Sequence, residues 1–115
     1  PPILIPRPET EEWVTWLINS LEPIKNQPLD ILDLCTGSGC ISLALAKALP
    51  QATIIGIDIN KAAIELAQEN MYHNKIDNCV FLQSDLYQAI PPNQQFDLIV
   101  SNPPYLSEVE WHNLD

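Results

Sequence analysis

Short apolar runs alternate along this chain with stretches in which apolar residues recur at helical spacing. A continuous short run indicates a strand that is buried on both faces, whereas recurrence every three or four residues indicates an amphipathic helix. The predicted strands cover residues 30–35, 52–59, 79–82 and 96–101. The predicted helices cover residues 10–21, 40–49 and 61–74, with Asn60 as the cap of the last one.

This alternation of strands and helices is typical of an α/β fold built on a parallel sheet. A polar, proline-flanked stretch at residues 22–29 reads as a linker between a lead-in segment with its helix, residues 1–21, and a main domain, residues 30–115. The fourth strand lies close to the end of the sequence, and an open sheet edge there would favour association with another chain. We therefore expect the sequence to be a segment of a longer protein.

A glycine-rich turn, residues 36–39 (TGSG), joins the first predicted strand to the next helix just after Asp33. Glycines at the carboxyl end of a parallel strand allow the backbone to approach a ligand closely. Two further carboxylates, Asp58 and Asp85, end or follow the next two strands. Because the carboxyl ends of parallel strands meet at one edge of the sheet, we expect the three acids to line a ligand-binding rim there.

Two cofactors are candidates for binding at this rim. Residues 37–42 read GSGCIS, which misses the dinucleotide fingerprint only because Ser42 replaces its third small residue. A dinucleotide brings a pyrophosphate, whereas S-adenosylmethionine brings a ribose, an adenine amine and cationic sulfonium and ammonium groups. Several carboxylates suit the second ligand better. We therefore favour S-adenosylmethionine and keep a dinucleotide-dependent oxidoreductase as an alternative.

The fourth predicted strand runs directly into Asn102-Pro103-Pro104-Tyr105. Two successive prolines end the sheet ladder and leave the carbonyl groups of Asn102 and Pro103 without strand partners. These oxygens and the Asn102 side-chain oxygen can accept both hydrogens of a planar amino group. Tyr105 can stack on that plane, so the nitrogen lone pair would face an incoming methyl group.

Together these motifs resemble the class I S-adenosylmethionine-dependent methyltransferases that modify exocyclic or amide nitrogens. The opening residues 5–11 (IPRPETE) are similar to the segment that precedes this domain in the HemK/PrmC glutamine methyltransferases. The resemblance covers nearly the whole chain. It implies a Rossmann-like class I methyltransferase sheet, of which the chain holds the first four strands of a seven-stranded, mainly parallel sheet. It also implies methyl transfer to a glutamine side-chain amide of a class 1 peptide chain release factor.

The same resemblance implies roles for individual residues. Those implied to bind the cofactor are Asp33, Thr36, Gly37, Gly39, Asp58, Asp85 and Asn102. Those implied to act in catalysis are Asn102, Pro103 and Tyr105, and the substrate contacts add Pro104. The chain departs from the family in its loop, where Cys35 replaces a glycine and Cys40 a small residue such as alanine. We expect the Cys35 side chain to narrow this loop.

Charge bears on the choice of substrate. Fifteen acids against five bases give a net charge of −10, which argues against direct binding of nucleic acid, because phosphate contacts require a basic surface. The motif at residues 102–105 is nevertheless shared with DNA-adenine and RNA-guanine methyltransferases, so a nucleic-acid amino-methyltransferase stays an alternative. An inactive cofactor-binding fragment is a further one. No apolar run approaches the roughly 18 residues of a membrane span, so we expect no membrane partner.

The cysteines and histidines give information on the cellular compartment and do not indicate a metal site or a disulfide framework. Three cysteines, an odd number, suit a reduced intracellular location better than a disulfide framework. The two histidines lie far apart, and metal-ligand spacing is absent, so no metal is expected. The resemblance implies either a bacterial cytoplasm or a mitochondrial matrix. Glu12-Trp13 and Cys35 incline the reading towards the mitochondrial kind.

Overall fold

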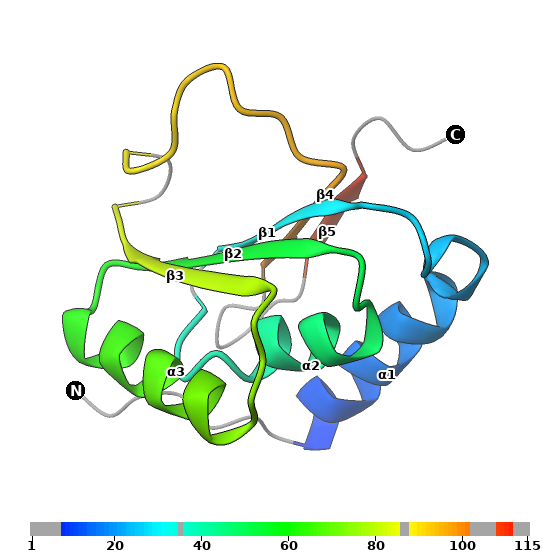
Figure 1. The fold of residues 1–115 in the computed structure, drawn as a ribbon, viewed down its shortest axis with the longest axis horizontal. Helices are drawn as coiled ribbons and strands as arrows, with labels where there is room; N and C mark the ends of the chain where they lie inside the picture. Colours follow the sequence, from blue (N-terminus) through cyan, green and yellow to red (C-terminus); the bar gives the residue numbers. More distant parts are fainter. Residues whose placement is uncertain (1–7, 35, 86–87, 102–107, 112–115) are drawn as a thin grey trace.

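A computed structural model of the chain describes residues 8–34, 36–85, 88–101 and 108–111. Within these residues the strands form one five-stranded sheet in the order β3-β2-β1-β4-β5 (Figure 1). The strands are β1 (Asp30–Leu34), β2 (Thr53–Asp58), β3 (Cys79–Gln83), β4 (Leu98–Ser101) and β5 (Glu108–Trp111). The helices are α1 (Pro8–Ser20), the 3-10 helix η1 (Glu22–Ile24), α2 (Cys40–Ala48) and α3 (Lys61–His73).

The four predicted strands are present and parallel, so the α/β prediction is confirmed. In the register of the sheet, Asp33 of β1 pairs with Gly56 of β2, and Asp58 of β2 pairs with Gln83 of β3. The fifth strand, β5, was not predicted and runs antiparallel to β4. Because β4 lies between β1 and β5, the expectation of an open sheet edge at the fourth strand is wrong. Its sequence, EVEW, is only four residues long and alternates polar with apolar, so it lacks the continuous apolar run of the other strands.

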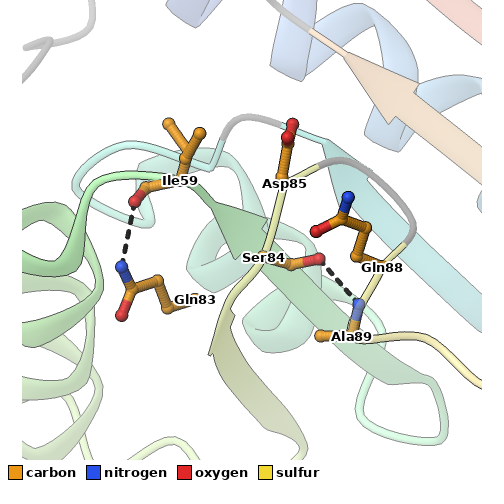
Figure 2. A pocket seen from close by; sticks show the side chains of 6 residues that line it. All are labelled: Ile59, Gln83, Ser84, Asp85, Gln88 and Ala89. Atoms are coloured by element: carbon orange, nitrogen blue, oxygen red, sulfur yellow. Dashed lines mark hydrogen bonds between the residues drawn. The ribbon is translucent and has the colours of Figure 1, made fainter.

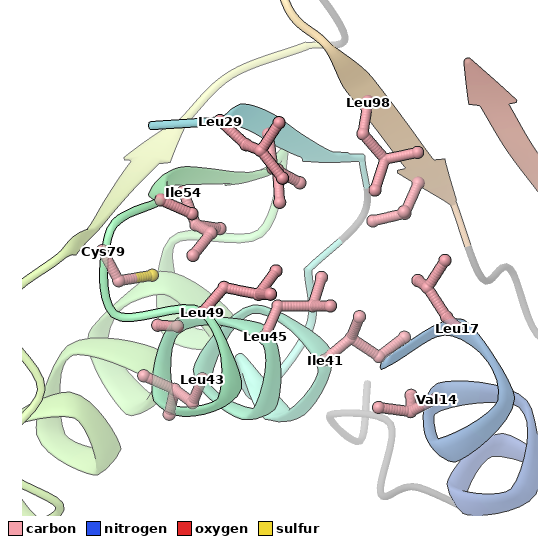
Figure 3. Close-up of a cluster of buried hydrophobic side chains, with 14 of the residues drawn as sticks. Val14, Leu17, Leu29, Ile41, Leu43, Leu45, Leu49, Ile54, Cys79 and Leu98 are labelled. Carbon is pink, nitrogen blue, oxygen red and sulfur yellow. The ribbon is translucent and has the colours of Figure 1, made fainter. Parts of the chain in front are cut away.

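The three α-helices lie on one face of the sheet, where they cover the larger hydrophobic core (Figure 1). Figure 3 shows how this core joins distant parts of the chain, with Leu17 of α1, Leu45 of α2 and Leu98 of β4 in one cluster. All three side chains have an exposed fraction of 0%. Burying one such aliphatic side chain stabilises a fold by about 1.5–3 kcal/mol, so α1 is held to the sheet by its apolar face.

The opposite face of the sheet is crossed by the segment between β3 and β4, which arches over it in Figure 1. Ile90 and Phe96 of this segment are buried against Leu32 and Ile57 of the sheet in a second, smaller cluster. The segment thereby leads the chain from the outer strand β3 back across the sheet to β4, beside β1.

Local interactions explain where the elements begin and end. Asn60 caps α3 as predicted, since its side-chain oxygen accepts hydrogen bonds from the backbone of Ala62 and Ala63 at 2.9 and 3.3 Å. In the stretch interpreted as a linker, η1 occupies Glu22–Ile24, and Leu29 at its end belongs to the larger core. No helix in the described part of the chain is long and apolar enough to cross a membrane.

Candidate functional site

The loop between β1 and α2 is the centre of the candidate site. Gly37 and Gly39 have φ angles of 56° and 83°, a left-handed conformation that side chains with a Cβ rarely adopt. The backbone N–H of Thr36 donates to the carbonyl oxygen of Ile57 at 2.8 Å, which ties the loop to β2. From α3, the Asn70 side-chain amide donates to the carbonyl oxygen of Ser38 at 3.0 Å. The loop is therefore fixed from two sides.

Asp58, at the end of β2, also holds this loop. Its Oδ2 accepts a hydrogen bond from the backbone N–H of Gly37 at 3.0 Å, and its Oδ1 accepts one from Asn60 at 2.9 Å. The carboxylate thus joins the glycine turn to the start of α3. The sequence placed Asp58 and Gly37 at the same edge of the sheet, and the structure brings them into direct contact.

Asp33 lies behind the loop rather than on an open rim, with an exposed fraction of 1%. Its Oδ2 accepts hydrogen bonds from the hydroxyl groups of Ser42 at 2.6 Å and Thr36 at 2.9 Å. Its Oδ1 is buried and has no hydrogen-bond partner in the described part of the chain. Burial raises the pKa of Asp33 to about 6, the two hydroxyl groups act against this rise, and the charge of Asp58 adds to it.

The raised pKa of Asp33 predicts a pH-dependent stability. Between about pH 4 and 6 the folded state holds more protons than the unfolded one, so the stability contributed by Asp33 is present below pH 4 and lost as pH rises through 6. About two pKa units correspond to about 3 kcal/mol. We therefore compare the wild type with Asp33→Asn by urea unfolding at several pH values. Between about pH 4 and 6, the free energy of unfolding of the wild type should fall by about 3 kcal/mol relative to that of Asp33→Asn. A constant difference between the two proteins would contradict it.

A hollow of about 410 Å³ lies beside the ends of β2 and β3 (Figure 2). The residues that line it are Ile59, Gln83, Ser84, Asp85, Gln88 and Ala89. Its walls are fixed by hydrogen bonds: Gln83 Nε2 donates to the carbonyl oxygen of Ile59 at 3.2 Å, and Ser84 Oγ accepts from the Ala89 N–H at 2.9 Å. In Figure 2 the side chains of Ile59 and Asp85 extend to the same side. One apolar and one acidic group therefore border a single opening.

Ile59 is a residue of this site that the sequence reasoning missed. It is 65% exposed, although isoleucine is one of the residue types most often buried. Its position directly after Asp58, at the carboxyl end of a parallel strand, was the available signal. The contact of Asn70 with the loop was also missed, because nothing in the sequence shows that α3 lies beside the loop.

Two groups of predicted site residues lie outside the described residues. They are the motif Asn102-Pro103-Pro104-Tyr105 and the loop residue Cys35. The other loop cysteine, Cys40, is exposed at the start of α2. Among the residues that the structure describes, no group of three histidines, cysteines or acids could hold a metal ion.

Comparison with known proteins relates this geometry to a family. A family model described as "Methyltransferase small domain" matches residues 15–113. The chain is 47% identical over 110 residues to the release factor glutamine methyltransferase of Flavobacterium psychrophilum, covering 93% of this chain and 38% of that protein. It is 47% identical over 112 residues to the Escherichia coli protein of the same name, covering 97% and 39%. The chain thus spans about two fifths of the length of these curated relatives.

Solved structures agree with the predicted fold. The ribosomal protein L11 methylase of Lactobacillus delbrueckii subsp. bulgaricus matches with a TM-score of 0.71 at 26% identity, covering 88% of this chain and 49% of that one. PKMT2 from Rickettsia typhi, solved in complex with AdoHcy, matches with a TM-score of 0.59 at 27% identity, covering 64% and 14%. The Rossmann-like methyltransferase fold predicted for the chain is confirmed.

Proposed function

This chain belongs to the methyltransferase small domain family, and we propose that it transfers a methyl group from S-adenosylmethionine to a glutamine side-chain amide of a class 1 peptide chain release factor. The observation that carries the proposal is the 47% identity to release factor glutamine methyltransferases over 93% of the chain. At that identity we expect relatives to share substrate chemistry as well as fold. The opening residues 5–11 support the same reading.

The described site fits the proposed cofactor. A Cβ on Gly39 would lie 2.9 Å from both Ala67 Cβ and the Phe81 ring, so a glycine is required for the loop to pack against the core beside the site. Ile59 offers an exposed apolar surface for the adenine ring, and Asp85, at the same hollow, offers an acceptor for the adenine amine. Asp58 can accept hydrogen bonds from the ribose hydroxyl groups beside the Gly37 backbone.

The bound cofactor supplies an electrophilic methyl group on a sulfonium, and the chain supplies orientation. An amide nitrogen is a poor nucleophile because its lone pair is delocalised. The carbonyl of Pro103 and the side chain of Asn102 would accept its two hydrogens, and Tyr105 would stack on the amide plane. Methylation would place positive charge on the amide nitrogen until one of its two protons passes to solvent water, and the Asn102 and Pro103 oxygens would face that charge. Acceptors already in place stabilise that charge.

The compared relatives also favour one compartment in this proposal. Both proteins come from bacteria, and neither supports the mitochondrial alternative, so we propose a bacterial cytoplasm as the compartment. The net charge of −10 favours a protein substrate over a nucleic acid, because phosphate binding requires basic residues.

A methyl-transfer assay with the full-length protein tests this function. We expect labelled methyl groups to pass from S-adenosylmethionine to a purified class 1 release factor. The label should be absent from a release factor whose acceptor glutamine is replaced by alanine. Incorporation into DNA or RNA alone would identify a nucleic-acid amino-methyltransferase. Cofactor binding without transfer to any acceptor would leave a cofactor-binding module.

Asp58→Ala should weaken the binding of S-adenosylmethionine by about tenfold or more, because a hydrogen bond to a charged group contributes about 1.5–3 kcal/mol. Calorimetry on the full-length protein measures this. The matched control is Asp97→Ala, which removes a carboxylate that accepts a backbone hydrogen bond from Asp30 at 2.8 Å, at the opposite end of the sheet. We expect the control to lose stability but to retain affinity. Unchanged affinity in a folded Asp58→Ala protein would remove Asp58 from the site.

A further inference from the structure

Ser42 occupies the fingerprint position that departs from the dinucleotide pattern, and the structure shows what its hydroxyl group does. It lies in the first turn of α2 with an exposed fraction of 0%. Its Oγ donates to Asp33 Oδ2 at 2.6 Å and lies 3.2 Å from Thr36 Oγ1. An alanine there would fit the helix equally well but would leave the buried carboxylate with one hydroxyl donor fewer.

We propose that Ser42, assisted by Thr36, is a positioning residue that keeps Asp33 ionised and holds its free Oδ1 ready to accept a cationic group of the cofactor. This inference rests on the proposed function, because it needs a cationic ligand in the loop. The cation is the ammonium or the sulfonium of S-adenosylmethionine. Ser42 itself would contact neither substrate nor cofactor and would act only through the Asp33 carboxylate.

The hydrogen-bond geometry opposes protonation of either oxygen of Asp33. Each hydroxyl group has one hydrogen, and both hydrogens point to Oδ2, so a proton on that oxygen would displace a donor. A proton on Oδ1 would become a buried O–H donor without an acceptor in the described part of the chain. An unpartnered buried polar group is unfavourable in either state, and a cation at Oδ1 removes that cost.

The groups that lower the pKa of Asp33 are the side-chain hydroxyl groups of Ser42 and Thr36 and, to a smaller extent, the backbone N–H of Ser42. From β2, the charge of Asp58 disfavours the ionised form. From β3, Cys79 is a neutral thiol, since burial, and secondarily the charge of Asp33, raise its pKa to about 12. No basic side chain is among the groups that act on the Asp33 pKa, whereas Ser42 and Thr36 both lower it. Hydrogen-bond donors of α2 and of the loop before it therefore stabilise the Asp33 carboxylate before a cation binds.

The test compares Ser42→Ala and Thr36→Val with the wild type in the full-length protein. Thr36→Val keeps the side-chain shape and removes the second donor. Ser20→Ala is the control, because Ser20 is exposed on α1 and its hydroxyl group donates to the Trp16 carbonyl oxygen. Carboxyl-carbon NMR measures the titration of Asp33 without ligand. Calorimetry from pH 5.5 to 8.5 measures the affinity for S-adenosylmethionine.

We expect Ser42→Ala to raise the pKa of Asp33 by about one unit, the effect of losing one hydrogen bond to a charged group. Affinity should then fall about tenfold at pH 5.5 and less than about threefold at pH 8.5. Thr36→Val should act in the same direction, and Ser20→Ala should change neither quantity.

An unchanged Asp33 titration in Ser42→Ala would overturn the inference. So would a loss of affinity that is equal at every pH, because that is the signature of a merely structural residue. If the wild type binds no S-adenosylmethionine at any pH, the proposed function fails. In that case, a raised Asp33 pKa in Ser42→Ala would still show that Ser42 controls the charge of Asp33. Failure of the proposed function is therefore distinguishable from failure of the role of Ser42.

Discussion

Replacing Gly39 with alanine should lower the free energy of unfolding by about 2–5 kcal/mol. The residue has a φ of 83°, and a Cβ there costs about 1–2 kcal/mol through backbone strain alone. The new methyl group would also lie 2.9 Å from Ala67 Cβ and from the Phe81 ring, and overpacking of this kind costs about 1–3 kcal/mol. Urea unfolding of the variant and the wild type measures the sum.

Gly56→Ala separates the two contributions. Its Cβ would lie 2.7 Å from the Phe81 ring and 2.8 Å from Thr36 Oγ1, but its φ is not positive, so only overpacking applies. We expect a loss of about 1–3 kcal/mol. In a Phe81→Leu background the contact with the Phe81 ring is relieved in both variants. Gly39→Ala should then still lose more stability than Gly56→Ala, because backbone strain and the Ala67 contact remain at Gly39, whereas only the Thr36 contact remains at Gly56. Equal losses in that background would contradict a cost of the positive φ of Gly39.

The elements of the fold that the sequence predicted are those with a strong local signal. β1, β2 and β3 are runs of apolar residues, and α3 begins at a capping asparagine, so each was predicted close to its observed bounds. The strand order β3-β2-β1-β4-β5 was not predicted, because it depends on where the segment after β3 crosses the sheet. β5 was missed because its polar and apolar residues alternate over too few positions to stand out.

In the candidate site, too, residues with a local sequence signal were predicted, whereas features that depend on tertiary packing were not. Gly37, Gly39 and Asp58 were predicted because a tight turn and a strand-end acid leave a mark in the sequence. The burial of Asp33 was not predicted, since it results from the way α2 lies against β1 and places the Ser42 hydroxyl within 2.6 Å of the carboxylate. Sequence reading treated Ser42 only as an imperfect match to a fingerprint. Its role as a donor is visible only in three dimensions.

Asn102→Ala should slow methyl transfer by about a hundredfold or more, the usual cost of losing one preorganised partner of the transition state. The residue follows β4 directly and precedes two prolines, whose fixed φ limits the freedom of the chain there. Its oxygen should accept from the substrate amide, and this hydrogen bond strengthens as positive charge develops on the nitrogen. An interaction that is stronger in the transition state than in the ground state raises turnover rather than affinity.

Cofactor affinity should change less than about threefold in Asn102→Ala, because Asp58 and Asp85 contact the distant part of the ligand in the proposed complex. Single-turnover methylation of a release factor by the full-length protein measures the first effect, and calorimetry with S-adenosylmethionine the second. The control is Asn93→Ala, which removes an exposed amide from the segment between β3 and β4 and should leave both quantities unchanged. Near-normal turnover by a folded Asn102→Ala enzyme would show that residues 102–105 only end a strand. A parallel loss of turnover and affinity would instead place Asn102 at the cofactor rather than at the substrate amide.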